Sequence, residues 1–240
     1  KNHQKCFMRE LFIPSLLQIP GIVKLVGYRY PLIDEEITNE KQTKLKVTKK
    51  NGESFILDLT SGIIISELMP NGSIKGITRQ YLESEGVGFE DRMNPTIRTK
   101  TIYGVASTMR KIHRRKTVHR DLKLENVFLD ENFEQKIADF GISKIIDDVN
   151  MTMGIGSPIY MAPELFIETD VKYGLPVDVY AFAMFVYKMF SNTVKFKNNK
   201  IIKSRQQFFM KIGRGERPVK PKNIPDCYWS LINNVKIDFR

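Results

Sequence analysis

A polar run at residues 119–126, which reads HRDLKLEN, constrains this 240-residue chain more than any other feature. It places the carboxylate of Asp121, the ammonium of Lys123 and the amide of Asn126 close together in sequence. A second carboxylate, Asp139, opens the sequence DFG, and residues 162–164 read APE. Together these groups can accept a proton, supply hard oxygen ligands to a divalent cation and neutralise an anion.

The three motifs resemble the signatures of a protein kinase catalytic domain, in the order of that family. By chance, the five fixed positions of HRDxKxxN would match at a given start on the order of once in a million. The resemblance covers nearly the whole chain and implies an α+β, two-lobe fold. Residues 1–69 would form an incomplete small β lobe with helix C. Residues 70–240 would form a larger, mainly helical lobe that is truncated at its end.

The resemblance also implies the chemistry, which is transfer of a phosphoryl group from ATP to protein hydroxyls with Mg²⁺. Asp121 would accept or orient the proton of the attacking hydroxyl, and Lys123 would face the phosphoryl group. Asn126 and Asp139 would bind the metal. In the family, a lysine two residues after the aspartate goes with serine/threonine specificity. The sequences VDVYAF at residues 177–182 and GERP at 215–218 look most like the tyrosine-kinase-like branch.

The nucleotide site follows from the same resemblance. Glu10 falls on the helix C glutamate, which normally pairs with a lysine on an earlier strand. Ser66 would be a small gatekeeper behind the adenine, and backbone groups of Glu67 and Met69 would bind the adenine edge. Phe128 would form the apolar floor of the adenine pocket.

Other matched positions carry structural roles in the family. Asp178 would cap the backbone of the catalytic loop, because a buried carboxylate needs hydrogen-bond partners. Glu164 normally pairs with a later arginine, for which Arg240 falls slightly early. The full structural set is His119, Arg120, Phe140, Gly141, Glu164 and Asp178.

The activation segment, residues 139–164, contains two candidate phosphorylation sites. Kinases with an arginine before the catalytic aspartate, as at Arg120, often need a phosphate in this segment, and Lys144 could complete a basic pocket for it. Thr152 is the first candidate, and an unmodified loop threonine is the alternative. Ser157 is the second candidate, although its family position also contacts the catalytic aspartate.

Two departures from the family favour a rival hypothesis, a pseudokinase or scaffold that signals by binding proteins. The chain contains no G-x-G-x-x-G loop and no V-A-x-K strand, so Glu10 has no lysine partner and this fragment is expected to be inactive. Pro14 follows Glu10 by one turn and removes an amide that a helix needs. We therefore expect helix C to kink or end near Ile13.

Local patterns predict further elements. Residues 44–48 and 55–59 read as strands joined by Asn51 and Gly52, a strong hairpin signal, within an insert at residues 34–61. Asn94 and Pro95 predict the start of a helix that runs over residues 96–115. Residues 176–190 are apolar nearly all round, as in a buried helix.

Composition bears on whether the chain binds nucleic acid or lipid, whether it spans a membrane, and where it is located. The formal net charge of +11 keeps a basic nucleic-acid- or lipid-binding module in view, but the charges lie in separate segments, so no nucleic-acid partner is expected. No apolar run approaches the roughly 18 residues of a membrane span, and no signal peptide is evident. The two cysteines lie far apart, which favours a reduced, cytoplasmic protein.

Overall fold

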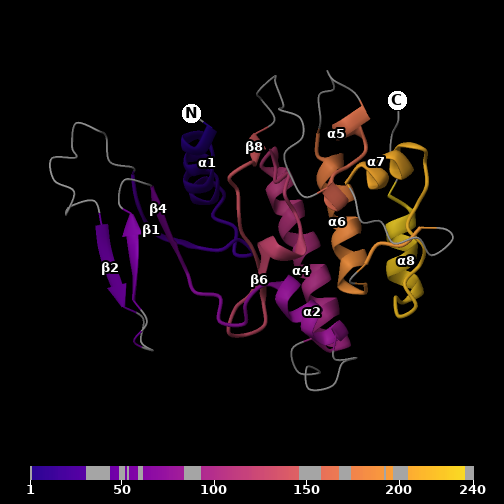
Figure 1. Ribbon diagram of the computed structural model, residues 1–240, viewed down its shortest axis with the longest axis horizontal. Coiled ribbons are helices and arrows are strands. Elements are labelled where there is room, and N and C mark those ends of the chain that lie inside the picture. Colours follow the sequence, from indigo (N-terminus) through magenta and orange to yellow (C-terminus); the bar gives the residue numbers. More distant parts are fainter. Residues whose placement is uncertain are drawn as a thin grey trace.

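The computed structural model describes residues 2–30, 44–48, 52, 54–58, 62–83, 93–145, 158–167, 174–191, 193–196 and 205–235. Strands and one helix lie at one end of the molecule, and most helices lie at the other (Figure 1). The α+β class that the sequence predicts is confirmed. None of the described helices is long and apolar enough to cross a membrane.

The N-terminal part combines helix α1 (Asn2–Leu17) with strands β1 (Leu25–Arg29) and β4 (Ile63–Ser66). The two strands pair antiparallel, with a register shift between Leu25 and Gly27. Between them in sequence, β2 (Lys44–Thr48) and β3 (Ser54–Asp58) form a separate antiparallel sheet. The expected hairpin is therefore present, and its second strand begins one residue earlier than predicted.

Of the two outcomes expected at Pro14, a kink or an end near Ile13, the structure excludes the end, because α1 continues to Leu17 with Pro14 inside it. A proline in a helix interior costs about 3 kcal/mol. The hydroxyl of Ser15 donates to the carbonyl of Leu11 at 2.7 Å, which gives this turn an extra hydrogen bond. Leu11, Ile13 and Leu17 are buried, and each such burial contributes about 1.5–3 kcal/mol. Burial of this face therefore outweighs the proline.

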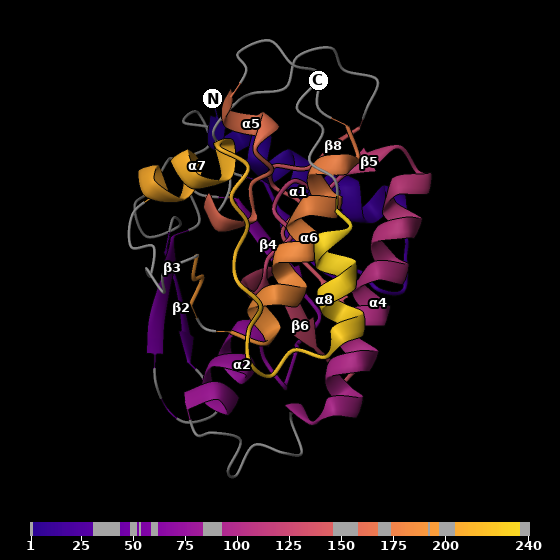
Figure 2. The same ribbon diagram turned by 90° about the vertical axis from the view of Figure 1, so that its right-hand side faces the viewer.

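The C-terminal part is built around α4 (Pro95–Arg114) and α6 (Pro176–Met189), with α2 (Ile74–Glu83), α7 (Arg205–Gly213) and α8 (Asp226–Asn233) beside them (Figure 2). As predicted, Asn94 caps α4, and its Oδ1 accepts from the amide of Ile97 at 2.9 Å. Helix α6 is buried on nearly all sides. These two helices contribute much of the hydrophobic core.

Short elements connect this core to the polar motifs. They are β5 (Thr117–Val118), η3 (Leu124–Asn126), β6 (Val127–Leu129), β7 (Gln135–Ile137), β8 (Lys144–Ile145), η4 (Pro158–Tyr160) and α5 (Glu164–Ile167). Strand β5 pairs with β8, and β6 pairs with β7. Residues 119–126 therefore follow β5, and the DFG sequence follows β7.

The segment after α1 joins the two parts of the molecule. Val23 N donates to Ile137 O at 2.9 Å, and Ile137 N donates to Gly21 O at 2.8 Å. A Cβ on Gly21 would lie 1.9 Å from Oγ1 of Thr108 on α4, so only glycine allows this approach. A second connection is the hydrogen bond from Leu129 N to Gly72 O at 3.0 Å.

Candidate active site

Three of the sequence-predicted residues meet at one place. The Nδ2 atom of Asn126 lies 2.9 Å from the carbonyl oxygen and 3.0 Å from Oδ2 of Asp121, and 3.3 Å from Oδ2 of Asp139. These residues come from the loop after β5, from the end of η3 and from the turn after β7. The structure therefore brings both carboxylates and the amide together.

Lys123 completes this group, because its Nζ forms an ion pair with Oδ2 of Asp121. Asp121 is buried and Asp139 is exposed, so the first carboxylate lies at the bottom of the site and the second faces solvent. Asp121 is thus oriented from two sides, by an ammonium and by an amide. Such fixed geometry is what a proton acceptor in a transfer reaction requires.

Asp178, in the first turn of α6, accepts hydrogen bonds from the loop at residues 119–126. Its Oδ2 accepts from the amide of His119 and its Oδ1 from the amide of Arg120, both at 2.8 Å. His113 on α4 lies 2.9 Å from the same Oδ2. Arg120 has φ 71°, a left-handed conformation that is strained for a side-chain-bearing residue. The hydrogen bonds from the amides of His119 and Arg120 to Asp178 hold the loop in this strained conformation.

His119 is fully buried and contacts both the HRD and the DFG sequences. The amide of Asp121 donates to His119 Nδ1 at 3.3 Å, which assigns the proton to Nε2, 3.1 Å from the carbonyl oxygen of Ala138. Burial lowers the pKa of His119, and this favours the neutral ring. The ring of Phe140 packs edge-on against it, with centroids 4.8 Å apart.

The DFG sequence lies beside Glu10. A Cβ on Gly141 would be 3.7 Å from Oε2 of Glu10, so α1 packs closely here. Burial raises the pKa of Glu10, and the negative charge of Asp139 raises it further. No residue that the structure describes forms an ion pair with Glu10. Asp139 itself has φ 65°, a second strained backbone in the site.

The predicted phosphorylation sites, Thr152 and Ser157, lie outside the described residues. Of the basic groups expected to face a phosphate, Arg120 donates from its guanidinium to the carbonyl of Ile142 at 3.4 Å. Lys144 is buried and pairs with Val118 in the register of β5 and β8.

Three of the expected adenine-binding residues, Ser66, Glu67 and Met69, lie at the end of β4 or just after it, and Phe128 lies in β6. Ser66 ends the strand and is exposed. The amide of Glu67 donates to Lys24 O at 2.9 Å, while its Oε1 accepts from Lys24 N at 2.7 Å. Phe128 is half-buried and bridges to Ser73. The amide of Glu67 is thus already bonded to Lys24.

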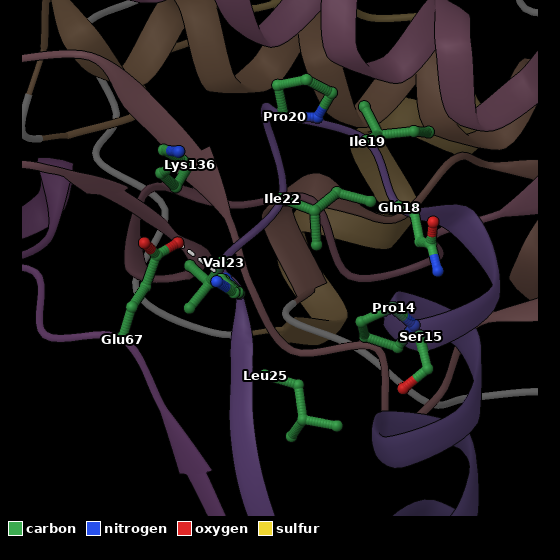
Figure 3. A pocket seen from close by; sticks show the side chains of 11 residues that line it. Pro14, Ser15, Gln18, Ile19, Pro20, Ile22, Val23, Leu25, Glu67 and Lys136 are labelled. Atoms are coloured by element: carbon green, nitrogen blue, oxygen red, sulfur yellow. Dashed lines mark hydrogen bonds between the residues drawn. The ribbon is translucent and has the colours of Figure 1, made fainter.

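A pocket of about 510 Å³ lies behind Glu67, between the end of α1, the following segment and β7. Figure 3 shows Glu67 and Lys136 on one side and Pro14, Ser15 and Gln18 on the other. None of the residues that meet at Asn126 lines it. Sequence reasoning missed this pocket, because segments distant in sequence form it and no motif marks them.

Glu164, the glutamate of the APE sequence, is half-buried, and burial raises the pKa of its carboxyl. Arg240, the arginine considered for it, lies outside the described residues. The hydroxyl of Tyr180 is buried without a hydrogen-bond partner among the described atoms. Burial raises the pKa of this hydroxyl. The positive charge of Arg217 lowers the pKa, and the negative charge of Glu164 raises it.

The donor set fits a magnesium–nucleotide complex. Mg²⁺ takes one or two protein oxygen ligands and completes its shell with phosphates and water. The exposed carboxylate of Asp139 and Oδ1 of Asn126, whose Nδ2 is turned to the two aspartates, could supply these ligands. No described cluster of three or more His, Cys, Asp or Glu side chains could form a cage from protein groups alone.

Comparison with known families matches residues 1–235 to the family described as "Protein kinase domain". This chain belongs to the protein kinase family. One relative of this kinase domain is the "RGS domain-containing serine/threonine-protein kinase A" of Dictyostelium discoideum, which is 31% identical over 72% of the chain and 14% of the relative. A "Probable serine/threonine-protein kinase" from the same organism is 28% identical over 95% of the chain and 14% of the relative.

A third relative is "Mitogen-activated protein kinase kinase kinase 1a" of Physcomitrium patens. It is 30% identical over 91% of the chain and 23% of the relative. The kinase domain therefore spans less than a quarter of the length of these three relatives.

Proposed function

We propose that the protein is a serine/threonine kinase that transfers the γ-phosphoryl group of ATP to hydroxyls of other proteins, with Mg²⁺ as cofactor. The main support is the meeting of Asp121 and Asp139 at the amide of Asn126. Membership of the family and the names of the relatives support the same activity. The lysine at position 123 favours serine/threonine specificity.

Each residue of the site then has a task. Asp121 accepts or orients the proton of the substrate hydroxyl, and Lys123 neutralises charge on the phosphoryl group. Asn126 and Asp139 would hold Mg²⁺, which would neutralise negative charge on the phosphates. Ser66, Glu67, Met69 and Phe128 surround the adenine. Glu10, beside Gly141, positions the nucleotide side of the site through α1.

The proposal also includes regulation by phosphorylation and a location in the cytoplasm. A phosphate on Thr152, with Ser157 as second candidate, would order the activation segment against Arg120 and Lys144. Both cysteines, Cys6 and Cys227, are free, as expected in the reducing cytoplasm.

Phosphate incorporation by the full-length protein tests the proposal. Asp121→Asn keeps the shape of the side chain but removes the proton acceptor, so incorporation of labelled phosphate into protein should fall by roughly a hundredfold or more. Glu131→Gln, at an exposed carboxylate outside the site, is the control and should retain wild-type activity. Unchanged incorporation by Asp121→Asn would refute the assigned base.

The rival is a scaffold that binds protein partners without phosphoryl transfer. The two hypotheses separate in the same assay. A scaffold shows no incorporation in the wild type, and Asp121→Asn leaves its partner binding intact.

A further inference from the structure

The pocket behind Glu67 has no part in the chemistry described above, and it has the size of a ligand site. Its volume of about 510 Å³ falls within the range of about 300–1,000 Å³ that is typical of sites for small molecules. Three parts of the chain form its walls: the end of α1 with the segment that follows, Glu67 after β4, and Lys136 on β7 (Figure 3). Because these walls face the pocket from different sides, it can surround a small molecule rather than only touch it.

The lining combines an apolar surface with two lysines. Lys136 is half-buried and Lys24 is exposed. Neither ammonium forms an ion pair with any residue that the structure describes. The apolar surface comes from prolines and aliphatic side chains, which are Pro14, Ile19, Pro20, Ile22, Val23 and Leu25.

Glu67 balances only part of this positive charge. Its Oε1 accepts from the backbone amide of Lys24 at 2.7 Å, and Figure 3 shows its carboxylate directed toward that segment. With two lysines and one glutamate, the lining carries a formal charge of +1. An anion that enters beside Lys136 gains a charge-assisted interaction, whereas a cation meets two like charges. The apolar walls favour an apolar body on the same molecule.

The backbone connects the pocket to the active site. Val23 lines the pocket, and its amide donates to the carbonyl of Ile137 at 2.9 Å. Ile137 directly follows Lys136 and lies two positions before Asp139. A molecule that contacts both Val23 and Lys136 therefore bridges the two segments that this hydrogen bond joins. Separation of these segments would remove the site of the molecule.

We propose that the pocket binds a small molecule with an apolar body and one anionic group, and that the bound molecule stabilises the junction between the segment after α1 and β7. The anionic group lies at Lys136 and Lys24, and the apolar body packs against the end of α1 and the segment that follows. This inference goes beyond the proposed kinase function, because binding requires no phosphoryl transfer.

Two fluorescent probes of the same shape test the class of ligand. Anilinonaphthalene sulfonate has an apolar aromatic body and one sulfonate, and phenylnaphthylamine has the same body without the sulfonate. In fluorescence titrations of the full-length protein, Lys136→Glu should weaken binding of the sulfonate about tenfold. The same substitution should change binding of the uncharged probe by less than about twofold, because the apolar walls remain.

Two further variants localise the bound probe. Lys24→Glu should weaken sulfonate binding about threefold, a smaller effect because the exposed side chain is screened by solvent. Lys100→Glu, at an exposed lysine of α4 outside the pocket, is the matched control and should leave the Kd unchanged.

Each contrary result in these titrations has a definite meaning. Unchanged sulfonate binding in both Lys136→Glu and Lys24→Glu, or no binding to the wild type, would overturn the site. Equal weakening of the two probes would overturn the anionic class. Should Lys136→Glu not fold, Lys24→Glu at its exposed position decides alone.

Hydrogen exchange of single amides tests the effect on the junction. With the free sulfonate at about ten times its Kd, exchange of the amides of Val23 and Ile137 should slow about tenfold, because an opening that breaks their hydrogen bonds also destroys the site. Amides of β2 and β3, which lie outside the pocket, should exchange at the same rate with and without the probe. Unchanged exchange at Val23 and Ile137 despite bound probe would overturn the stabilisation of the junction.

None of these measurements uses ATP. A negative result in them therefore leaves the proposed kinase activity standing. Conversely, a protein that incorporates no phosphate would contradict the kinase proposal and leave the binding result at the pocket unaffected.

Discussion

At the scale of single residues, the site depends on backbone conformations that the chain would not adopt alone. Arg120 and Asp139 both have positive φ, and such residues cost on the order of 1–3 kcal/mol each. Asp178 opposes this strain at Arg120 through two charge-assisted hydrogen bonds from consecutive amides.

Asp178→Asn tests how much this support contributes. An asparagine has one acceptor oxygen where aspartate has two, so one of the two loop amides is left without its acceptor in a buried place. We expect the free energy of unfolding to fall by about 2–4 kcal/mol in urea titrations. Asp226→Asn, at a carboxylate that is 94% exposed, is the matched control and should change it little. Equal effects of the two substitutions would show that Asp178 does not stabilise the loop.

The sequence was informative about these residues to different degrees. The motifs predicted that Asp121, Asn126 and Asp139 share a site, and the structure brings their side chains together. They could not identify the ion pair of Lys75 with Glu125, which forms only because α2 packs against η3. Charge clusters built across several elements leave no local pattern.

At the scale of elements, prediction succeeded where local chemistry decides the structure. Asn94 and Pro95 start α4, and Asn51 and Gly52 lie between β2 and β3, because capping and turn formation depend on neighbouring residues. An end of the helix near Pro14, one of the two outcomes expected there, did not occur, because burial of Leu11, Ile13 and Leu17 favours the continued helix. A local sequence pattern does not include the stabilisation that comes from burying side chains against distant parts of the chain.

Pro14→Ala therefore should stabilise the protein. Alanine restores the amide of position 14 and removes the clash of the proline ring with the preceding turn, so we expect a gain of about 1–3 kcal/mol in the free energy of unfolding. Leu16→Ala, at an exposed position of α1, is the control and should change it by less than about 0.5 kcal/mol. A loss of stability in Pro14→Ala would mean that the ring itself packs in the structure.

At the scale of the whole molecule, stability should be unevenly distributed. Helices α4 and α6 lie in the core, whereas β2 and β3 pair only with each other among the described strands. An isolated two-stranded hairpin is marginally stable in water. The protein thus combines a firm helical part with a weakly held hairpin.

Amide hydrogen exchange tests this difference. After correction for intrinsic rates, amides of α4 and α6 should exchange slowest, with protection near the global free energy of unfolding. Amides of β2 and β3 should exchange orders of magnitude faster, because local opening suffices to expose them. Equal protection in the hairpin and in α6 would contradict this distribution.

The hydrogen bonds that join Gly21 and Val23 to Ile137 also decide how the two parts can move. Any rotation of α1 and β1 against the helical part must turn about these bonds or break them. Asp139 follows Ile137 so closely in the chain that it lies next to that pivot. Its carboxylate is therefore displaced least when the parts swing, while the far end of the β1 and β4 sheet travels the furthest.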